Sequence, residues 1–324
     1  MKRFKDGWNR FFLAPSQGEA LSALRIVVGL AMLVEAVVLW PYRNELFGPM
    51  GFLQVHLLDF LTGPTIPGLA VQHGVPVGTY LVFLKVVYLV HVGSLVFFTL
   101  GAGTGAMAVA VWLTKAFLVN SGNYSSYGVD SYFHNIAFLL ALFPCGRHWS
   151  LDSWRRKEAA APLPSCTLGL RMIQIFLLMT YINAGVGKGV GAQWWTGEAI
   201  WGSLNLPEFS HFGSFAWMAS VPWVPRLLGW ATVLIEALYF LGVWIPRLGT
   251  AWVLAIAGMH LGIALFMGMY QFGITLAAIN VVLFLEPWRL VSSWVESFRR
   301  LQIQKPASYL AGSFNSGVTV GPNR

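Results

Sequence analysis

The sequence is poor in charge and in cysteine. Asp, Glu, Lys and Arg make up only 10% of the 324 residues, against a hydrophobic share of 56%. So little charge excludes an ordinary soluble globular protein and indicates a multi-pass membrane protein. The two cysteines, Cys145 and Cys166, flank one predicted cytoplasmic loop, where thiols stay reduced, so we expect no disulfide between them.

Several sequence motifs of catalysis and binding are also absent. The chain has no HExxH or paired CxxC signature and no GxSxG elbow, so we predict no metal site. GVGKG is not a phosphate-binding loop, because Ile182 stands where its first glycine is required and Gly189 stands where Ser or Thr should follow Lys188. The net charge is +8, but no basic stripe interleaved with aromatic residues occurs, which excludes nucleic acid as a partner.

Long apolar runs dominate the chain instead. Runs of roughly 18 to 25 mainly apolar residues, enough to cross about 30 Å of hydrocarbon, recur along it. We therefore predict an all-α, polytopic membrane bundle of about eight transmembrane helices. The predicted spans are Ala20–Tyr42, Gly78–Leu100, Thr104–Asn120, Ser131–Cys145, Cys166–Gly189, Leu227–Ile245, Leu248–Met267 and Phe272–Leu285.

The positions of the basic residues predict the orientation in the cell membrane. With an even number of spans, most of the 21 Lys and Arg residues fall in cytoplasmic segments, and both termini lie on that side. We divide the chain into a basic, aromatic cytoplasmic anchor (residues 1–15), a transmembrane domain (16–288), and a cytoplasmic amphipathic helix with a disordered tail (289–324). The first apolar run is followed by further spans, so we expect it to be retained rather than cleaved.

Two long segments, Asn44–Val77 and Gly191–Val224, fall on the predicted outer face. The second is rich in tryptophan, with Trp194, Trp195, Trp201, Trp217 and Trp223. Such aromatic density is typical of residues at headgroup level. We therefore predict interfacial or re-entrant helices that cover the outer end of the bundle.

Ionisable residues inside the spans are the main functional signal. Each is costly in hydrocarbon and tends to face the bundle interior or a wet cavity. Most map to the outer half of the bundle or near its middle, which predicts one polar pocket that opens outward beneath the aromatic segments. The residues assigned to this pocket are Glu35, Lys85, Lys115, Asp130, His134, Lys188, Trp194, Trp195, Glu236 and His260.

Two pairs among these residues each allow two interpretations. Asp130 and His134 lie one helical turn apart, so the carboxylate can orient the imidazole as a general base or as half of a metal site. Alternatively, Asp130 caps its helix and His134 bonds a neighbouring span. Glu236 and His260 form either a proton relay or one buried pair that ties two consecutive spans together.

Lys188 lies in the most unusual stretch, Tyr181–Gly202. This stretch leaves a hydrophobic helix, passes through several glycines and ends near Trp194 and Trp195. A lysine in hydrocarbon requires a partner, and glycines allow close helix packing, so we expect a group opposite Lys188. The residue is either a base in a desolvated pocket or a lysine whose head snorkels to the headgroups.

Four stretches resemble the HTTM family, membrane domains similar to that of vitamin K-dependent gamma-carboxylase. The resemblance covers about Ser16 to Trp288. The stretches are ALRIVVGLAMLVE with the following LFGPMGFL, NYSSYGVDSYFHNIAFLLALFPCGRHWSLD, YINAGVGKGVGAQWWTGEAI and MHLGIALFMGMYQFGI.

The resemblance implies a helical bundle that acts on a reduced quinone, such as vitamin K hydroquinone. In the carboxylase a lysine is the candidate base, and it matches Lys188, while the carboxylase's pocket histidine falls near Asp130. The size of the chain, without a large extracytoplasmic part, is also similar to the branch represented by sporulation-delaying protein B, membrane proteins involved in maturing a secreted peptide toxin.

Two classes of function therefore remain open. The first is a membrane enzyme, lyase-like or quinol-oxidising, that acts on a quinone-like lipid or a membrane-bound peptide. The second is a non-catalytic protein that matures or exports a peptide together with a partner protein. Transport is a weaker third hypothesis, because inverted repeats are not apparent.

Overall fold

The structure is a computed structural model that describes residues 2–51, 55–122, 127–156, 161–209 and 213–287. The chain divides into two units, Met1–Leu285 and Glu286–Arg324, and all of the described helices belong to the first. The described residues are helical with no strand; one isolated bridge joins Ser16 and Leu163. The predicted all-α class is confirmed for this part of the chain. The predicted amphipathic helix after Trp288 lies outside the described residues.

Each of the predicted spans coincides with helical structure. The helices, in the order of the predicted spans, are α2 (Glu19–Leu39), α6 (Val77–Leu100), α7 (Thr104–Ser121), α8 (Gly128–Leu142), α10 (Pro164–Gly189), α13 (Trp223–Ala237) with α14 (Tyr239–Gly242), α15 (Leu248–Met267) and α16 (Tyr270–Leu285). Among the described residues, four helical segments are long and apolar enough to cross a membrane: Glu19–Phe47, Val77–Leu100, Pro164–Gly189 and Leu248–Met267. Tyr270–Leu285 is a shorter apolar helix.

Most helix bounds differ from the predicted ones by a few residues, and two of the differences have a structural cause. Helix α8 begins at Gly128 rather than Ser131, because the Asp130 carboxylate accepts a hydrogen bond from the backbone N–H of Tyr127 at 2.9 Å and so starts the helix earlier. The predicted sixth span is two helices, α13 and α14, which are separated at Leu238.

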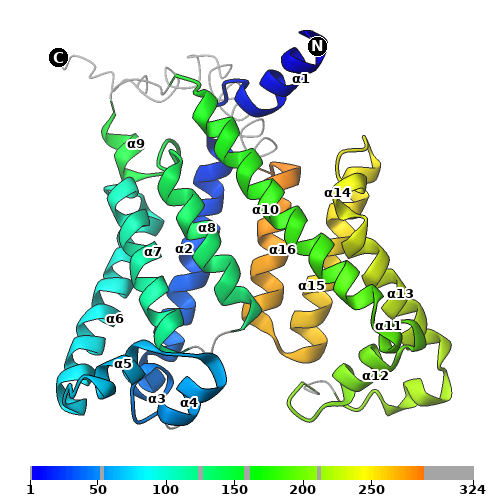
Figure 1. The fold of residues 1–324 in the computed structure, drawn as a ribbon. Helices are drawn as coiled ribbons and strands as arrows, with labels where there is room; N and C mark the ends of the chain where they lie inside the picture. The colour runs from blue at the N-terminus through cyan, green and yellow to red at the C-terminus, as the bar shows by residue number, and fades with distance from the viewer. Residues whose placement is uncertain (1, 52–54, 123–126, 157–160, 210–212, 288–324) are drawn as a thin grey trace, which may run out of the picture. The chain divides into compact units, whose positions relative to one another are not determined.

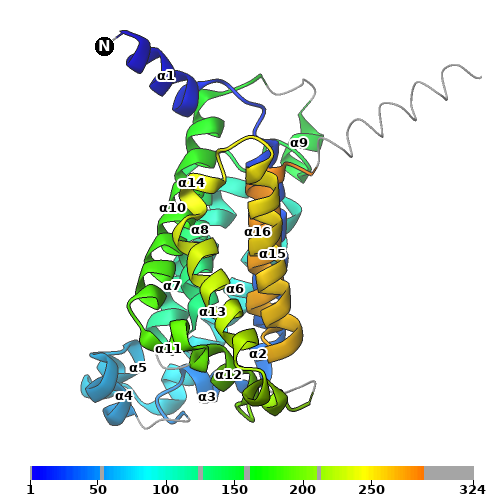
Figure 2. The same cartoon turned by 90° about the vertical axis from the view of Figure 1, so that its right-hand side faces the viewer.

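Short helices lie at both ends of the first unit (Figures 1 and 2). The two views agree that α1 (Lys2–Leu13) and α9 (Leu151–Arg155) lie at one end. The opposite end carries α3 (Arg43–Phe47), α4 (Val55–Thr62), α5 (Ile66–Gln72), α11 (Ala192–Thr196) and α12 (Glu198–Asn205). The 3-10 helices are η1 (Trp40–Tyr42) and η2 (Ala216–Ser220). Both long segments predicted on the outer face therefore contain short helices.

Helix α2 organises the packing. It contacts α6, α8, α10 and α16, while α10 packs on α13 and α15 packs on α16. The wholly buried Arg25 of α2 donates to the backbone oxygens of Cys145 at 3.3 Å and Trp149 at 2.5 Å. Large apolar side chains such as Val82 on α6 and Leu254 on α15 remain exposed. Exposed apolar side chains on long helices suit contact with lipid rather than with water.

The basic anchor at the N-terminus is a helix that contacts the bundle. Arg171 of α10 donates to the Phe11 backbone oxygen at 3.2 Å, and its guanidinium lies 4.3 Å from the Phe11 ring centroid. Phe4 and Trp8 of α1 are exposed. The predicted basic and aromatic segment therefore forms an amphipathic helix whose end is held by Arg171.

Candidate functional site

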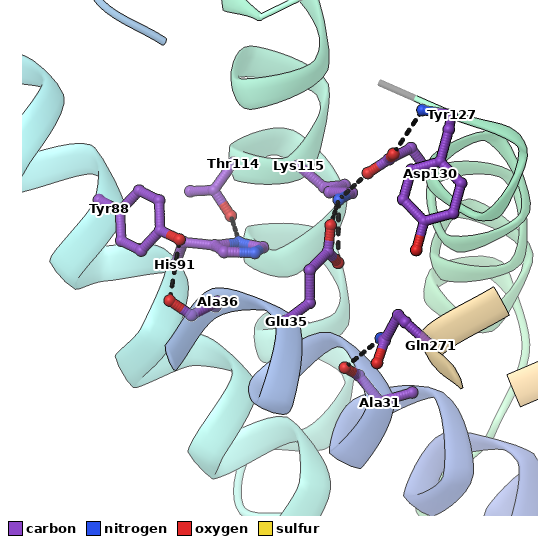
Figure 3. Close-up of polar contacts among 10 residues, drawn as sticks. All are labelled: Ala31, Glu35, Ala36, Tyr88, His91, Thr114, Lys115, Tyr127, Asp130 and Gln271. Carbon is purple, nitrogen blue, oxygen red and sulfur yellow. Dashed lines mark hydrogen bonds and ion pairs between the residues drawn. The ribbon is translucent and has the colours of Figure 1, made fainter. Parts of the chain in front are cut away.

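Three predicted pocket residues from three helices meet around one ammonium group (Figure 3). Lys115 of α7 lies 2.9 Å from Glu35 Oε1 of α2 and 2.6 Å from Asp130 Oδ1 of α8. All three side chains are at most 12% exposed. We call this group the Lys115 triad. It contains two carboxylates for one ammonium, and the second Asp130 oxygen caps α8.

A shell of hydrogen-bonded residues surrounds the triad on the side of α6. Tyr88 donates to the Ala36 backbone oxygen at 2.8 Å, and His91 Nδ1 lies 2.7 Å from the Thr114 hydroxyl (Figure 3). Tyr88 and His91 are both buried. Each has a partner of its own, so neither compensates the second carboxylate of the triad.

A cavity of about 630 Å³ adjoins the triad. Its charged end is formed by Glu35, Lys115 and Asp130, and most of its wall is apolar. Tyr127 and Gln271 add polar groups near this end (Figure 3). An apolar cavity with a few convergent polar groups is the usual form of a small-molecule site.

Lys188 forms a second ionic site, which lies between α10 and α13. Its ammonium lies 2.5 Å from Glu236 Oε2 of α13 and 5.4 Å from the Trp194 ring centroid. The Lys188 side chain is 24% exposed, whereas that of Glu236 is 6% exposed. We call this group the Lys188 pair. The expectation that a group lies opposite Lys188 is confirmed, and that group is Glu236.

Glycine explains how α10 and α13 come close enough to form the pair. A Cβ atom on Gly185 would lie 2.3 Å from the backbone nitrogen of Ala237, beside Glu236. Gly229 of α13 likewise lies against the backbone oxygen of Trp194. A side chain at Gly185 would push α10 away from α13, so this glycine places Lys188 against Glu236. Gly229 instead lets α11, which carries Trp194, pack closely on α13. Trp195 contributes its indole N–H to the Gly189 backbone oxygen at 2.7 Å and is partly exposed.

His260 belongs to a third, fully buried group. Its Nε2 lies 2.7 Å from the Tyr181 hydroxyl, which accepts from the Asn280 side-chain N–H at 2.8 Å. Tyr239 donates to the Asn280 side-chain oxygen at 2.8 Å. His260 Nδ1 has no hydrogen-bond partner among the described residues. Glu236 and His260 form no ion pair, so the hypothesis that they make one buried pair is wrong, since each has a different partner.

Lys85 and His134 lie outside these groups. Lys85 is exposed on α6 and does not line the cavity, because the buried face of α6 is formed by Tyr80, Leu84 and Tyr88. The His134 ring lies 6.1 Å from that of Trp112 rather than on Asp130, whose oxygens are taken by Lys115 and Tyr127. The single predicted pocket is therefore divided into separate sites.

The residues that sequence reasoning did not single out are mainly uncharged. Tyr88, Tyr127, Tyr181, Tyr239 and Asn280 all touch or neighbour the buried ionisable groups. Asn280 carried a usable signal, because an amide inside an otherwise apolar helix requires buried hydrogen-bond partners. The tyrosines carried none, since aromatic residues also fill the rest of the bundle.

Asp152, at the end that carries α9, holds the start of α7. Its carboxylate accepts from the backbone N–H groups of Gly103 at 2.9 Å and Thr104 at 2.8 Å, and from the Thr104 hydroxyl at 2.7 Å. Partial burial opposes ionisation of Asp152, but the hydrogen bonds from Thr104 and Gly103 outweigh it and lower the pKa of the carboxyl.

No three His, Cys, Asp or Glu side chains in the described part of the chain are grouped so as to hold a metal ion. Comparison with protein-family models, with curated proteins and with solved structures found no match to this chain.

Proposed function

We propose that the chain is an integral membrane protein that crosses the cell membrane about eight times, with both termini in the cytoplasm. Four helical segments have the required length and apolarity, and the helices at the other four predicted spans pack beside them. The end that carries α1 and α9 is then cytoplasmic. The short helices α3 to α5, α11 and α12 lie at the outer end, where exposed Trp201 and Trp217 suit the headgroup level.

Labelling of an introduced cysteine tests this topology. Ser153 lies in α9, and both natural cysteines are buried. An impermeant thiol reagent should modify Ser153→Cys only after the cells are opened. Modification from outside intact cells would contradict the proposed orientation.

We also propose that the protein is a membrane enzyme of the HTTM type, in which Lys188 acts as a base toward a reduced quinone or a membrane-bound peptide. The observation that carries this proposal is the Lys188 pair, in which a partly exposed lysine contacts a buried carboxylate. Transfer of the ammonium proton to Glu236 gives a neutral amine and a neutral acid. A neutral pair is favoured by low polarity, because charged groups lose their hydration there. The amine can then accept a proton from the substrate.

The lysine is positioned to meet a substrate from the membrane. Its side chain is about one quarter exposed, whereas its partner carboxylate is enclosed by the bundle. Trp194 lies beside the ammonium and offers an aromatic face on which a ring can stack. This arrangement supports a flat, lipid-soluble substrate such as a hydroquinone, whose hydroxyl supplies the proton.

Oxidation of a reduced naphthoquinone by dissolved dioxygen, followed by mass spectrometry with the protein in lipid nanodiscs, tests this function, because dioxygen oxidises the anion that remains when Lys188 takes the hydroxyl proton. Lys188→Arg should lose the activity, because a guanidinium does not deprotonate at working pH. Lys85→Arg is the matched control, since Lys85 is also in an apolar helix but is exposed on α6. Full activity of Lys188→Arg would remove Lys188 as the base.

The alternative, a non-catalytic protein that matures a secreted peptide together with a partner, is favoured by a different observation. Trp195, Trp201, Trp217 and Trp223 are all exposed in or beside the segment that carries α11 and α12. Exposed tryptophans are a common feature of surfaces that bind other proteins. Mass spectrometry of the gently extracted protein distinguishes the two functions: a co-purified quinone favours the enzyme, and a co-purified peptide favours the partner protein.

A further inference from the structure

The cavity beside the Lys115 triad is not used by the proposed reaction at Lys188. None of the described residues that line this cavity belongs to the Lys188 pair. The cavity is bounded instead by α2, α7, α8, α3 and the start of α16. A ligand of this cavity is therefore distinct from the substrate proposed at Lys188. The charge and the shape of the cavity indicate the chemistry of that ligand.

The charge of the cavity wall is unbalanced. Glu35 and Asp130 are both within hydrogen-bond distance of Lys115, so the triad has a formal charge of −1. Lys115 is the sole cation among the described residues that line the cavity. Arg43, at the same end of α2, lies 4.3 Å from the Trp40 ring centroid and donates to the Trp40 backbone oxygen instead. Two carboxylates that share a single ammonium favour a positively charged ligand, because an added cation balances the second carboxylate.

The shape of the site indicates that the positively charged ligand also has an apolar chain. A groove of about 420 Å³ runs between α2 and α16 and shares Val34, Tyr270 and Gln271 with the cavity. Its wall is mainly apolar and includes Val27, Leu30, Ala31, Ile274 and Ala278. Leu30 and Ile274 are about half exposed, so the groove opens on the surface of the bundle.

Gln271 lies where the groove meets the cavity. It bridges α16 to α2 by donating to the Ala31 backbone oxygen at 2.7 Å (Figure 3). Because the cavity and groove share Gln271 and its neighbours, a charged head beside Glu35 can continue into a chain that lies along α2. The groove opens between α2, which is long and apolar enough to cross a membrane, and the shorter apolar helix α16, so the chain can enter from the bilayer.

We propose that the cavity and groove form one binding site for a single-chain amphiphile with a cationic head, such as a long-chain primary amine. The ammonium lies at the carboxylates of Glu35 and Asp130, and the alkyl chain lies between α2 and α16. A fatty acid is excluded, because its carboxylate would meet two others. A neutral alcohol of the same length gains the apolar contacts but not the charge complementarity.

Equilibrium binding of radiolabelled dodecylamine to the full chain in phosphatidylcholine nanodiscs tests the proposal, with empty nanodiscs as background. Binding should saturate at one molecule per protein, and dodecylamine should bind roughly tenfold more tightly than dodecanol, as expected for one added charge contact. Dodecanoate should not compete. Equal binding of the amine and the alcohol, or competition by dodecanoate, would overturn the proposal.

Substitutions separate the head from the chain. Glu35→Gln keeps an acceptor for Lys115 but neutralises the triad, so the preference for the amine should fall to within about twofold. Asp130→Asn is a second variant with the same expected loss. Glu236→Gln, which changes the other buried carboxylate, should keep the preference. A preference that survives both Glu35→Gln and Asp130→Asn would show that the carboxylates are not the head site.

A substitution in the groove tests whether the alkyl chain of the ligand lies there. Ala31→Phe fills the groove and should weaken dodecylamine binding several-fold, as expected when a chain loses its apolar contacts, but leave hexylamine binding unchanged. Val82→Phe is the control, because Val82 is exposed on α6, away from the groove. Equal effects of Ala31→Phe on the long and the short amine would contradict a chain in the groove.

Discussion

The bundle holds two lysines in apolar helices that lie in opposite settings. Lys115 contacts two carboxylates and its side chain is 6% exposed, whereas Lys188 contacts one carboxylate and is 24% exposed. The Lys115 triad therefore has an excess negative charge beside a cavity, and the Lys188 pair is neutral. The number of partners and the depth of burial, rather than the residue type, decide what each lysine can do. The triad suits binding of a cation, and the pair suits exchange of a proton.

The largest expected effect is the loss of the ammonium from the triad. Lys115→Met leaves Glu35 and Asp130 buried without their shared cation, which should destabilise the fold by about 3–5 kcal/mol. Unfolding in mixed micelles, followed by circular dichroism, measures this change.

Two further variants sharpen that measurement. Lys85→Met is the control and should change the stability by less than about 0.5 kcal/mol, because Lys85 is exposed. Adding Glu35→Gln and Asp130→Asn to Lys115→Met should recover part of the loss. If Lys115→Met is as stable as Lys85→Met, the triad does not hold the three helices together.

Removal of the lysine from the Lys188 pair should destabilise the fold less than removal of Lys115. Lys188→Met leaves only one carboxylate, Glu236, without its partner, and Lys188 is itself partly exposed, so we expect a loss of about 2–3 kcal/mol. A double-mutant cycle with Glu236→Gln should show coupling, because the double variant removes both charges. The corresponding cycle between Glu236→Gln and His260→Ala should be additive within about 0.5 kcal/mol. Strong coupling in the second cycle, or none in the first, would contradict the pairing.

A substitution in a third region, the uncharged hydrogen-bond network around Tyr181, should lower the stability by a still smaller amount. Tyr181→Phe leaves the buried His260 Nε2 and the Asn280 N–H without their partner, at a cost of about 1–2 kcal/mol. Thermal unfolding in detergent measures the loss. Tyr270→Phe is a suitable control, because Tyr270 is exposed on α16. Equal stability of the two variants would mean that the hydroxyl of Tyr181 contributes nothing measurable.

The sequence was sufficient to predict the helices but not to predict which face of each helix is buried. Each apolar run predicted a helix, because length and hydropathy do not depend on the neighbours of a helix. Lys85 and Lys115 are indistinguishable by these measures, since α6 and α7 are apolar on all sides. Only packing shows that Lys115 lies in line with the buried Ala108, Val111 and Leu118, and that Lys85 lies off the buried face of α6.

The partner of each buried charged residue could not be predicted from the sequence either. The glycines near Lys188 predicted close packing, and Gly185 does meet α13. Glu236 was nevertheless assigned to His260, the nearest candidate on the next span. Its partner comes from α10 instead, because Gly185 of α10 allows close approach to Ala237 of α13, a residue far away in the sequence. Pairings of this kind follow from helix packing, which a single sequence does not report.

The smallest predicted effect lies outside both ionic sites, at Asp152. This carboxylate caps the start of α7 from another helix, and a lost cap costs about 1 kcal/mol. Asp152→Ala should show that loss near neutral pH. Asp152→Asn keeps an acceptor and should lose less. Asp6→Ala, which changes an exposed residue of α1, is the control.

The pH dependence supplies an independent measurement of the same cap. The folded state lowers the pKa of Asp152, so its contribution is present above the unfolded pKa of about 3.9 and is lost as the pH falls through the lower folded value. Between pH 7 and pH 3, the stability of Asp152→Ala should therefore fall less than that of the natural protein. Asp6→Ala should follow the natural protein across this range. If Asp152→Ala shows the same acid dependence as the natural protein, the hydrogen bonds from Gly103 and Thr104 do not stabilise the ionised carboxylate.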